Sequence, residues 1–139
     1  ALYFTREASG DATGCAVDAL VEKQIRPRCV SLIKIDVEGL ELSVLRSAAH
    51  TIELDRPIIY CEVVEAQLAR QGHGPADLDH FLRSRGYRFF RNRGERNSTH
   101  DRFEIVEMGA LAEGGGFFDC LAIPVERIAA LRAAGRLPA

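Results

Sequence analysis

The sequence lacks any apolar run long enough to cross a membrane, because its uncharged stretches fall well short of the roughly 20 residues that a spanning helix needs. It also lacks a strong charge of either sign: 20 acidic and 18 basic side chains give a formal net charge of −2. A domain that binds polyanions is usually strongly basic. These absences exclude a membrane-spanning protein and give no reason to expect a nucleic-acid or membrane partner.

Cysteine pairs with metal-ligand spacing are also missing. Cys15, Cys29, Cys61 and Cys120 are widely spaced and form no Cys-x-x-Cys pair, so the sequence offers no zinc cluster. Two of them lie in apolar, strand-like segments, and a chain of this length can bury a core without disulfides. We therefore predict buried, reduced thiols and a cytoplasmic location, with a disulfide framework as the alternative.

What the sequence does have is an alternation of strand-like and helix-like segments. Runs rich in β-branched and apolar residues predict strands, and apolar residues at three- and four-residue spacing predict helices. The predicted strands cover residues 29–37, 58–64, 87–90, 102–106 and 117–123, and the predicted helices cover 17–24, 40–53, 75–86 and 124–135. This order predicts an α/β fold, and the nearly continuous apolar run at 58–64 predicts a strand buried on both faces.

The predicted strand at 31–37 has no glycine-rich strand-to-helix turn before it, although an open α/β sheet normally places its ligand between two central strands. We therefore expect residues 1–139 to form a single domain that is the C-terminal part of a larger sheet. We also expect the edge of the strand at 31–37 to be uncovered, which would favour pairing with a second copy of the chain.

Acidic residues lie at the carboxyl ends of two predicted strands. Strand alternation places Lys34 and Asp36 on one face, and Glu38 follows at the turn that Gly39 permits. Glu62 lies near the end of the next strand. If the two strands are parallel neighbours, Asp36, Glu38 and Glu62 converge on one rim, which suits cation attraction or general-base catalysis. The alternatives are a solvated polar face on an edge strand, and a Glu62 satisfied by a backbone amide or an arginine.

Two blocks of the sequence resemble the signature of FkbM-type methyltransferases. That signature is a strand ending in K-x-D-x-E-G-x-E, a helix, and a strand reading R-P-x-x-x-x-E. The matching blocks are Lys34-Ile35-Asp36-Val37-Glu38-Gly39-Leu40-Glu41 and Arg56-Pro57-Ile58-Ile59-Tyr60-Cys61-Glu62, with Val44-Leu45-Arg46-Ser47-Ala48 in the helix between them. The resemblance covers most of residues 17–91.

The resemblance implies a Rossmann-like methyltransferase sheet that here lacks its N-terminal cofactor-binding strands. It further implies S-adenosyl-L-methionine as cofactor and a hydroxyl of a sugar, polyketide or related small metabolite as methyl acceptor. We expect Asp36 to act as base or to position donor or acceptor, Glu38 to make a second polar contact, and Glu62 to support them, with Asp36 and Gly39 near the cofactor and no metal. The alternative function is an inactive α/β remnant that dimerises through its strand edge.

Overall fold

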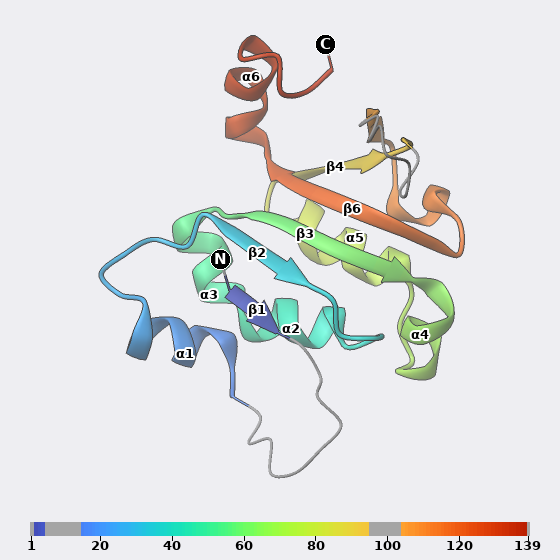
Figure 1. Cartoon of the computed structure of the whole chain (residues 1–139). Helices are drawn as coiled ribbons and strands as arrows, with labels where there is room; N and C mark the ends of the chain where they lie inside the picture. The colour runs from blue at the N-terminus through green and yellow to red at the C-terminus, as the bar shows by residue number, and fades with distance from the viewer. Residues whose placement is uncertain (1, 5–14, 95–103, 139) are drawn as a thin grey trace.

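The computed structural model describes residues 2–4, 15–94 and 104–138, which form a sheet with helices on both sides (Figure 1). In chain order the elements are β1 (Leu2–Phe4), α1 (Val17–Gln24), β2 (Leu32–Ile35), α2 (Glu41–Ser47), α3 (Ala49–Asp55), β3 (Ile58–Val64), α4 (Glu65–Arg70), α5 (Pro75–Arg83), β4 (Tyr87–Asn92), β5 (Ile105–Met108), the 3₁₀ helix η1 (Leu111–Gly114), β6 (Phe117–Pro124) and α6 (Val125–Ala133). None of the helices in this described part of the chain has the length and apolar composition that a bilayer crossing requires.

The sheet has six strands in the order β1-β2-β3-β6-β4-β5. The strands β1, β2 and β3 are parallel, whereas β6 runs antiparallel to β3 and to β4, and β5 runs antiparallel to β4. The predicted α/β class is confirmed, and so is the parallel pairing considered for the predicted strands at 29–37 and 58–64. This mixed sheet with flanking helices is consistent with a Rossmann-like methyltransferase fold.

The two faces of the sheet are covered unequally. Figure 1 shows α1 to α5 on one side and α6 on the other. The helix-covered face carries the main core, in which Ile33, Ile35, Ile59, Val63 and Phe118 are buried. On the opposite face, α6 covers only the part around Phe90 and Ile123. We call this second side the open face.

The third strand differs from its prediction because its residues alternate between the two faces. Ile59, Cys61 and Val63 are buried on the helix-covered face, while Ile58, Tyr60, Glu62 and Val64 are only half-buried. A continuous apolar run therefore does not produce burial on both faces here, since helices pack on one side of this strand and leave the other partly exposed.

The prediction of a single helix at 40–53 is wrong in one respect, because the structure has two helices there, α2 and α3, that meet at Ala48. The Ser47 hydroxyl donates to the Val44 carbonyl at 2.8 Å and accepts the Val17 amide at 3.3 Å. A serine that bonds back to its own helix competes with the backbone ladder and bends it. The sequence reading also missed α4 and η1, and residues 102 and 103 of the predicted strand at 102–106 lie outside the described residues.

Two further expectations need correction. The edge of β2 is not uncovered, because β1 pairs with it in parallel, with Leu2 opposite Ile33 and Phe4 opposite Ile35. Dimerisation through that edge therefore loses its structural premise. All four cysteines are free, but only Cys61 and Cys120 are buried, and Cys15 and Cys29 are exposed because they precede the first helix and the second strand in surface connections.

Candidate functional site

A row of carboxylates crosses the open face at the carboxyl ends of β2 and β3. The parallel register places Lys34 beside Tyr60 and Ile35 beside Cys61. Continuing that register by one residue brings Asp36 beside Glu62, and both side chains follow the open-face alternation of their strands. The strands therefore place two of the three predicted acids on the same face.

A third carboxylate, Asp119, extends this row and was missed by the sequence analysis. It lies on β6 directly opposite Glu62, so the two side chains share the open face. We call Asp36, Glu62 and Asp119 the acid row. The available signal was a single acid inside the apolar run Phe117-Phe118-Asp119-Cys120-Leu121, the same pattern that drew attention to Glu62. What the sequence did not show is that β6 is the neighbour of β3.

The pKa of the Cys61 thiol is affected by the carboxylates near it. Burial is the main reason that the pKa of Cys61 lies well above its usual value, and the charges of Cys120, Glu41, Glu62 and Asp36 raise it further. Carboxylates from β2, β3 and α2 are therefore close enough to act on one buried atom.

Asp36 is held at the row by its neighbour Lys34. The Lys34 ammonium nitrogen lies 3.3 Å from Oδ2 of Asp36, and the two side chains are 41% and 44% exposed. An exposed pair of this kind contributes little to stability. The carboxylate is therefore oriented but remains accessible to a ligand.

The turn after β2 has a backbone that most residues avoid. Glu38 and Gly39 have φ angles of 51° and 101°, both in the left-handed region. A Cβ at Gly39 would lie 2.5 Å from the backbone oxygen of Gln67 in α4, so only glycine lets the turn pack so closely. Glu38 is exposed in this turn. Because Glu38 lies outside the strand, the register that places Asp36 beside Glu62 does not extend to Glu38.

A buried glutamate, which the sequence analysis did not single out, fixes this turn. Glu41 is 2% exposed, and its Oε1 accepts the Gly39 amide at 2.9 Å. Its Oε2 is buried without a hydrogen-bond partner among the described residues. Glu41 thus connects the start of α2 to the turn that follows Asp36.

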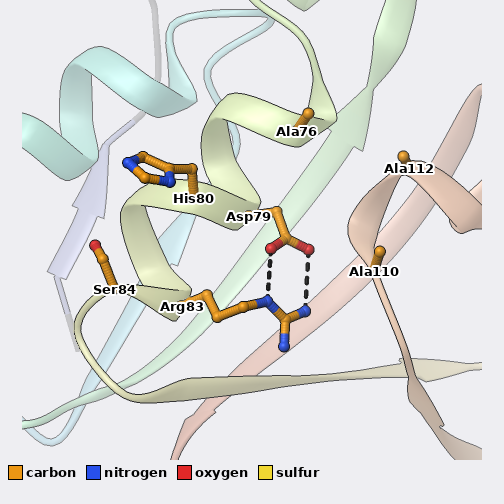
Figure 2. Close-up of a pocket in the computed structure, with 7 residues that line it drawn as sticks. All are labelled: Ala76, Asp79, His80, Arg83, Ser84, Ala110 and Ala112. Atoms are coloured by element: carbon orange, nitrogen blue, oxygen red, sulfur yellow. Dashed lines mark hydrogen bonds and ion pairs between the residues drawn. The ribbon is translucent and has the colours of Figure 1, made fainter.

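A larger cavity lies beside α5, and none of the residues that line it belongs to the acid row. This groove has a volume of about 550 Å³ and is lined by residues of α5, by Ser84 and by Ala110 and Ala112. Figure 2 shows the lining residues. Asp79 and Arg83 pair there at 2.8 Å, and Asp79 also accepts the Leu111 amide at 2.9 Å. These contacts fasten η1 to α5, so the polar groups of the groove already serve the fold.

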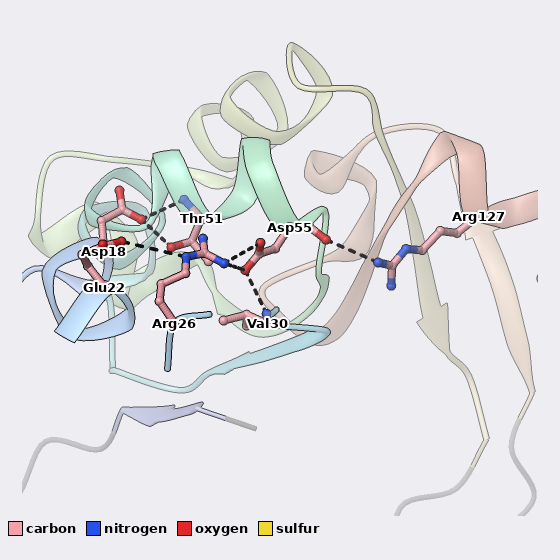
Figure 3. A network of polar contacts seen from close by, with 7 residues as sticks. All are labelled: Asp18, Glu22, Arg26, Val30, Thr51, Asp55 and Arg127. Carbon is pink, nitrogen blue, oxygen red and sulfur yellow. Dashed lines mark hydrogen bonds and ion pairs between the residues drawn. The ribbon is translucent and has the colours of Figure 1, made fainter. Parts of the chain in front are cut away.

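The network in Figure 3 is also structural, and it stands on the helix-covered side of the sheet. Asp55 accepts two bonds from Nη1 of Arg26, at 2.8 and 2.9 Å, and the Val30 amide at 2.8 Å. Burial alone would raise the pKa of Asp55, but the Val30 amide and Arg26 outweigh it and hold the pKa below its usual value. Asp18 similarly accepts the amide and hydroxyl of Thr51. These bonds anchor α1 and the start of β2 to α3.

The described ranges contain no group of three or more His, Cys, Asp or Glu side chains arranged to hold a metal ion. The acid row is spread over three strands rather than gathered around one point. Its arrangement suits contacts along an extended ligand, with one carboxylate at each strand.

A family model supplies the decisive comparison. The model described as the Methyltransferase FkbM domain matches residues 12–89, more than half of the chain. The chain belongs to the FkbM methyltransferase family. It matches none of the curated proteins and none of the solved structures with which it was compared.

The FkbM match places the described site in context. It contains Asp36, Glu38, Gly39 and Glu62, so these residues lie in a methyltransferase domain. It ends at residue 89, before β6, so Asp119 lies beyond the matched segment. The resemblance first noted in the two sequence blocks is therefore confirmed at the level of the family.

Proposed function

We propose that this FkbM methyltransferase domain transfers the methyl group of S-adenosyl-L-methionine to a hydroxyl oxygen of a small metabolite. The observation that carries the proposal is the pairing of Asp36 and Glu62 on one face, at the carboxyl ends of two adjacent parallel strands. In open α/β sheets, ligands bind outside the carboxyl ends of the strands. The family match supports methyl transfer as the reaction.

The acid row fits the charged end of this cofactor. S-adenosyl-L-methionine carries a positive sulfonium and a positive α-ammonium group, and carboxylates attract both. Asp36 is 44% exposed and can meet such a group, and Gly39 gives the adjoining turn its close backbone path. When bound, the cofactor supplies an activated methyl group.

The residues of the chain then have two tasks, which are alignment and proton removal. Alignment of the acceptor oxygen with the methyl donor supplies most of the rate acceleration in such a transfer. A hydroxyl is a weak nucleophile until a base takes its proton. We assign that base to the carboxylate of Asp36, with Glu62 beside it to accept a hydrogen bond from the acceptor and Glu38 as a second polar contact at the turn.

Replacing Asp36 by asparagine tests the assignment. Asp36→Asn keeps the size of the side chain but removes the base, so kcat for methyl transfer should fall at least about 100-fold. The measurement is formation of S-adenosylhomocysteine from S-adenosyl-L-methionine in the presence of a panel of hydroxylated acceptors.

The control is Asp77→Asn, which removes one carboxylate from the surface of α5 and keeps an oxygen that can accept the Gly74 amide. Its rate should equal that of the unmodified protein. Near-normal turnover in Asp36→Asn would refute the role of Asp36. Absence of both turnover and cofactor binding in the unmodified protein would refute the proposed reaction.

A further inference from the structure

Glu41 is a buried carboxylate whose charge is only partly satisfied by the residues around it. The side chain is 2% exposed, and among the described residues it accepts one hydrogen bond, from the Gly39 amide at 2.9 Å. Its Oε2 is buried and has no hydrogen-bond partner in that part of the chain. An ionised carboxylate is costly to bury in this way. A glutamine could accept the same amide without a buried charge, so holding the turn does not by itself account for a glutamate here.

The charge of Glu41 lies near the carboxyl ends of β2 and β3. Glu41 begins α2 directly after the turn that follows Asp36, and its bond to Gly39 holds it against that turn. Burial is the main reason that the pKa of the Cys61 thiol in β3 lies well above its usual value, and the charge of Glu41 is among those that raise it further. The charge at the start of α2 therefore acts on atoms of β3.

Exposure separates Glu41 from the other charges at this end of the sheet. Lys34 and Asp36 form an ion pair at 3.3 Å, and their side chains are 41% and 44% exposed. Water and salt screen such a pair, and its two charges offset each other. Glu41 is surrounded by protein, and a charge in a medium of low dielectric constant acts over a longer distance. Glu41 thus adds a poorly screened negative charge beside the candidate site.

A negative potential distinguishes the two forms of the proposed cofactor. S-adenosyl-L-methionine carries a positive sulfonium, whereas S-adenosylhomocysteine, the product of methyl transfer, has a neutral thioether in its place and is otherwise the same. Two unit charges about 15 Å apart, at an effective dielectric constant of about 20, change a dissociation constant about sixfold. A buried charge can therefore favour the methyl donor over the product without touching either of them.

We propose that Glu41 is a specificity-determining residue whose buried charge raises the affinity for S-adenosyl-L-methionine relative to S-adenosylhomocysteine. Such a preference favours exchange of the product for a new methyl donor. The inference rests on the proposed methyl transfer for its cofactor. It concerns a ratio of two affinities, however, and this ratio can fail to change while the methyl-transfer proposal stands.

Glu41→Gln is the direct test. Glutamine keeps an oxygen that can accept the Gly39 amide and removes the charge. Isothermal titration of the unmodified protein and of the variant with each ligand gives the dissociation constant of S-adenosylhomocysteine divided by that of S-adenosyl-L-methionine. This ratio should fall about threefold or more in Glu41→Gln. The affinity for the neutral ligand should change less than about twofold, because no charge of that ligand at sulfur is lost or gained.

Lys34→Met tests the same account with the opposite sign. It removes an exposed positive charge near Asp36. The affinity ratio should therefore rise, and by less than Glu41→Gln lowers it, because water screens the exposed charge. Sodium chloride at about 0.5 M should reduce the effect of Lys34→Met more than that of Glu41→Gln.

Asp77→Asn is the control, because it removes a carboxylate from the surface of α5 and keeps an acceptor for the Gly74 amide. It should leave the affinity ratio unchanged. Circular dichroism melting curves show whether each variant is folded, and Lys34→Met, at an exposed position, keeps the test decisive if Glu41→Gln does not fold.

An unchanged ratio in Glu41→Gln, or equal weakening of both ligands, would overturn the inference and leave Glu41 as a structural residue of the turn. A lower ratio in Lys34→Met, or a change in Asp77→Asn as large as that in Glu41→Gln, would overturn the electrostatic account. Normal methyl transfer with an unchanged ratio would overturn this inference alone. Failure of the unmodified protein to bind either ligand would overturn the cofactor, and with it both proposals.

Discussion

Asp55 and the acid row show two ways in which this protein uses carboxylates. The Asp55 side chain is 2% exposed, and Arg26 and the Val30 amide occupy both of its oxygens. Asp36, by contrast, is 44% exposed and has one lysine contact at 3.3 Å. A carboxylate whose bonding capacity is filled by the protein stabilises the fold, whereas one that is oriented but accessible can meet a ligand. The difference lies in the partners, since both residues are aspartates beside a cation.

The largest loss of stability is expected at the turn after β2, which lies beside the acid row. Gly39→Ala would place a Cβ 2.5 Å from the Gln67 carbonyl oxygen at a φ of 101°. Backbone strain and the displaced α4 should together lower the free energy of unfolding by about 3 kcal/mol. Denaturant unfolding measures this loss, and methyl transfer should fall with it.

Gly72→Ala is the matched control for that variant. Gly72 also has a positive φ, 76°, but a Cβ there would meet nothing within 4 Å. Only the backbone strain remains, so the loss should be about 1 kcal/mol. Equal losses in the two variants would show that the contact with Gln67 does not matter and that the turn is not held by α4.

Removing the charge of Asp55 should have the next largest effect. Asp55→Asn weakens the two bonds from Arg26 and the bond from the Val30 amide, so the free energy of unfolding should fall by about 2 kcal/mol. Asp36→Asn loses only an exposed pair and should change stability by less than about 0.5 kcal/mol. A larger loss in Asp36→Asn than in Asp55→Asn would reverse the comparison.

The contribution of Asp55 to stability should also depend on pH. The pKa of Asp55 in the folded protein lies below its ordinary value of 3.8. Its contribution is therefore complete above that value and is lost as the pH falls through the lower, folded-state pKa. The stability difference between the unmodified protein and Asp55→Asn should be constant near neutral pH and shrink below about pH 4. A difference that grows on acidification would contradict this sign.

The sequence predicted the positions in the acid row better than it predicted the Asp55 network. Strand alternation was enough to place Asp36 and Glu62 at corresponding strand ends, because a period of two fixes the face of each side chain. Asp119 could not be placed, since its neighbour Glu62 lies 57 positions earlier and only the strand order joins them. The Asp55 network was missed for the same reason: its partners, Arg26 and Val30, belong to other segments of the chain. A local sequence pattern predicts on which face of a strand a side chain lies. Its neighbours on other strands depend on the strand order of the sheet.

The smallest expected effect concerns the ion pair of Arg56 and Glu126, in which the carboxylate is exposed. Arg56 Nε lies 2.7 Å from Glu126, whose side chain is 49% exposed, and Arg56 also donates to the Arg85 carbonyl at 2.6 Å. The bond from Arg56 lowers the pKa of Glu126. Because water screens the pair and Arg56 keeps its other partners, Glu126→Gln should lower the free energy of unfolding by about 0.5 kcal/mol or less. A loss as large as that of Asp55→Asn would mean that exposure does not decide how much a carboxylate contributes to this fold.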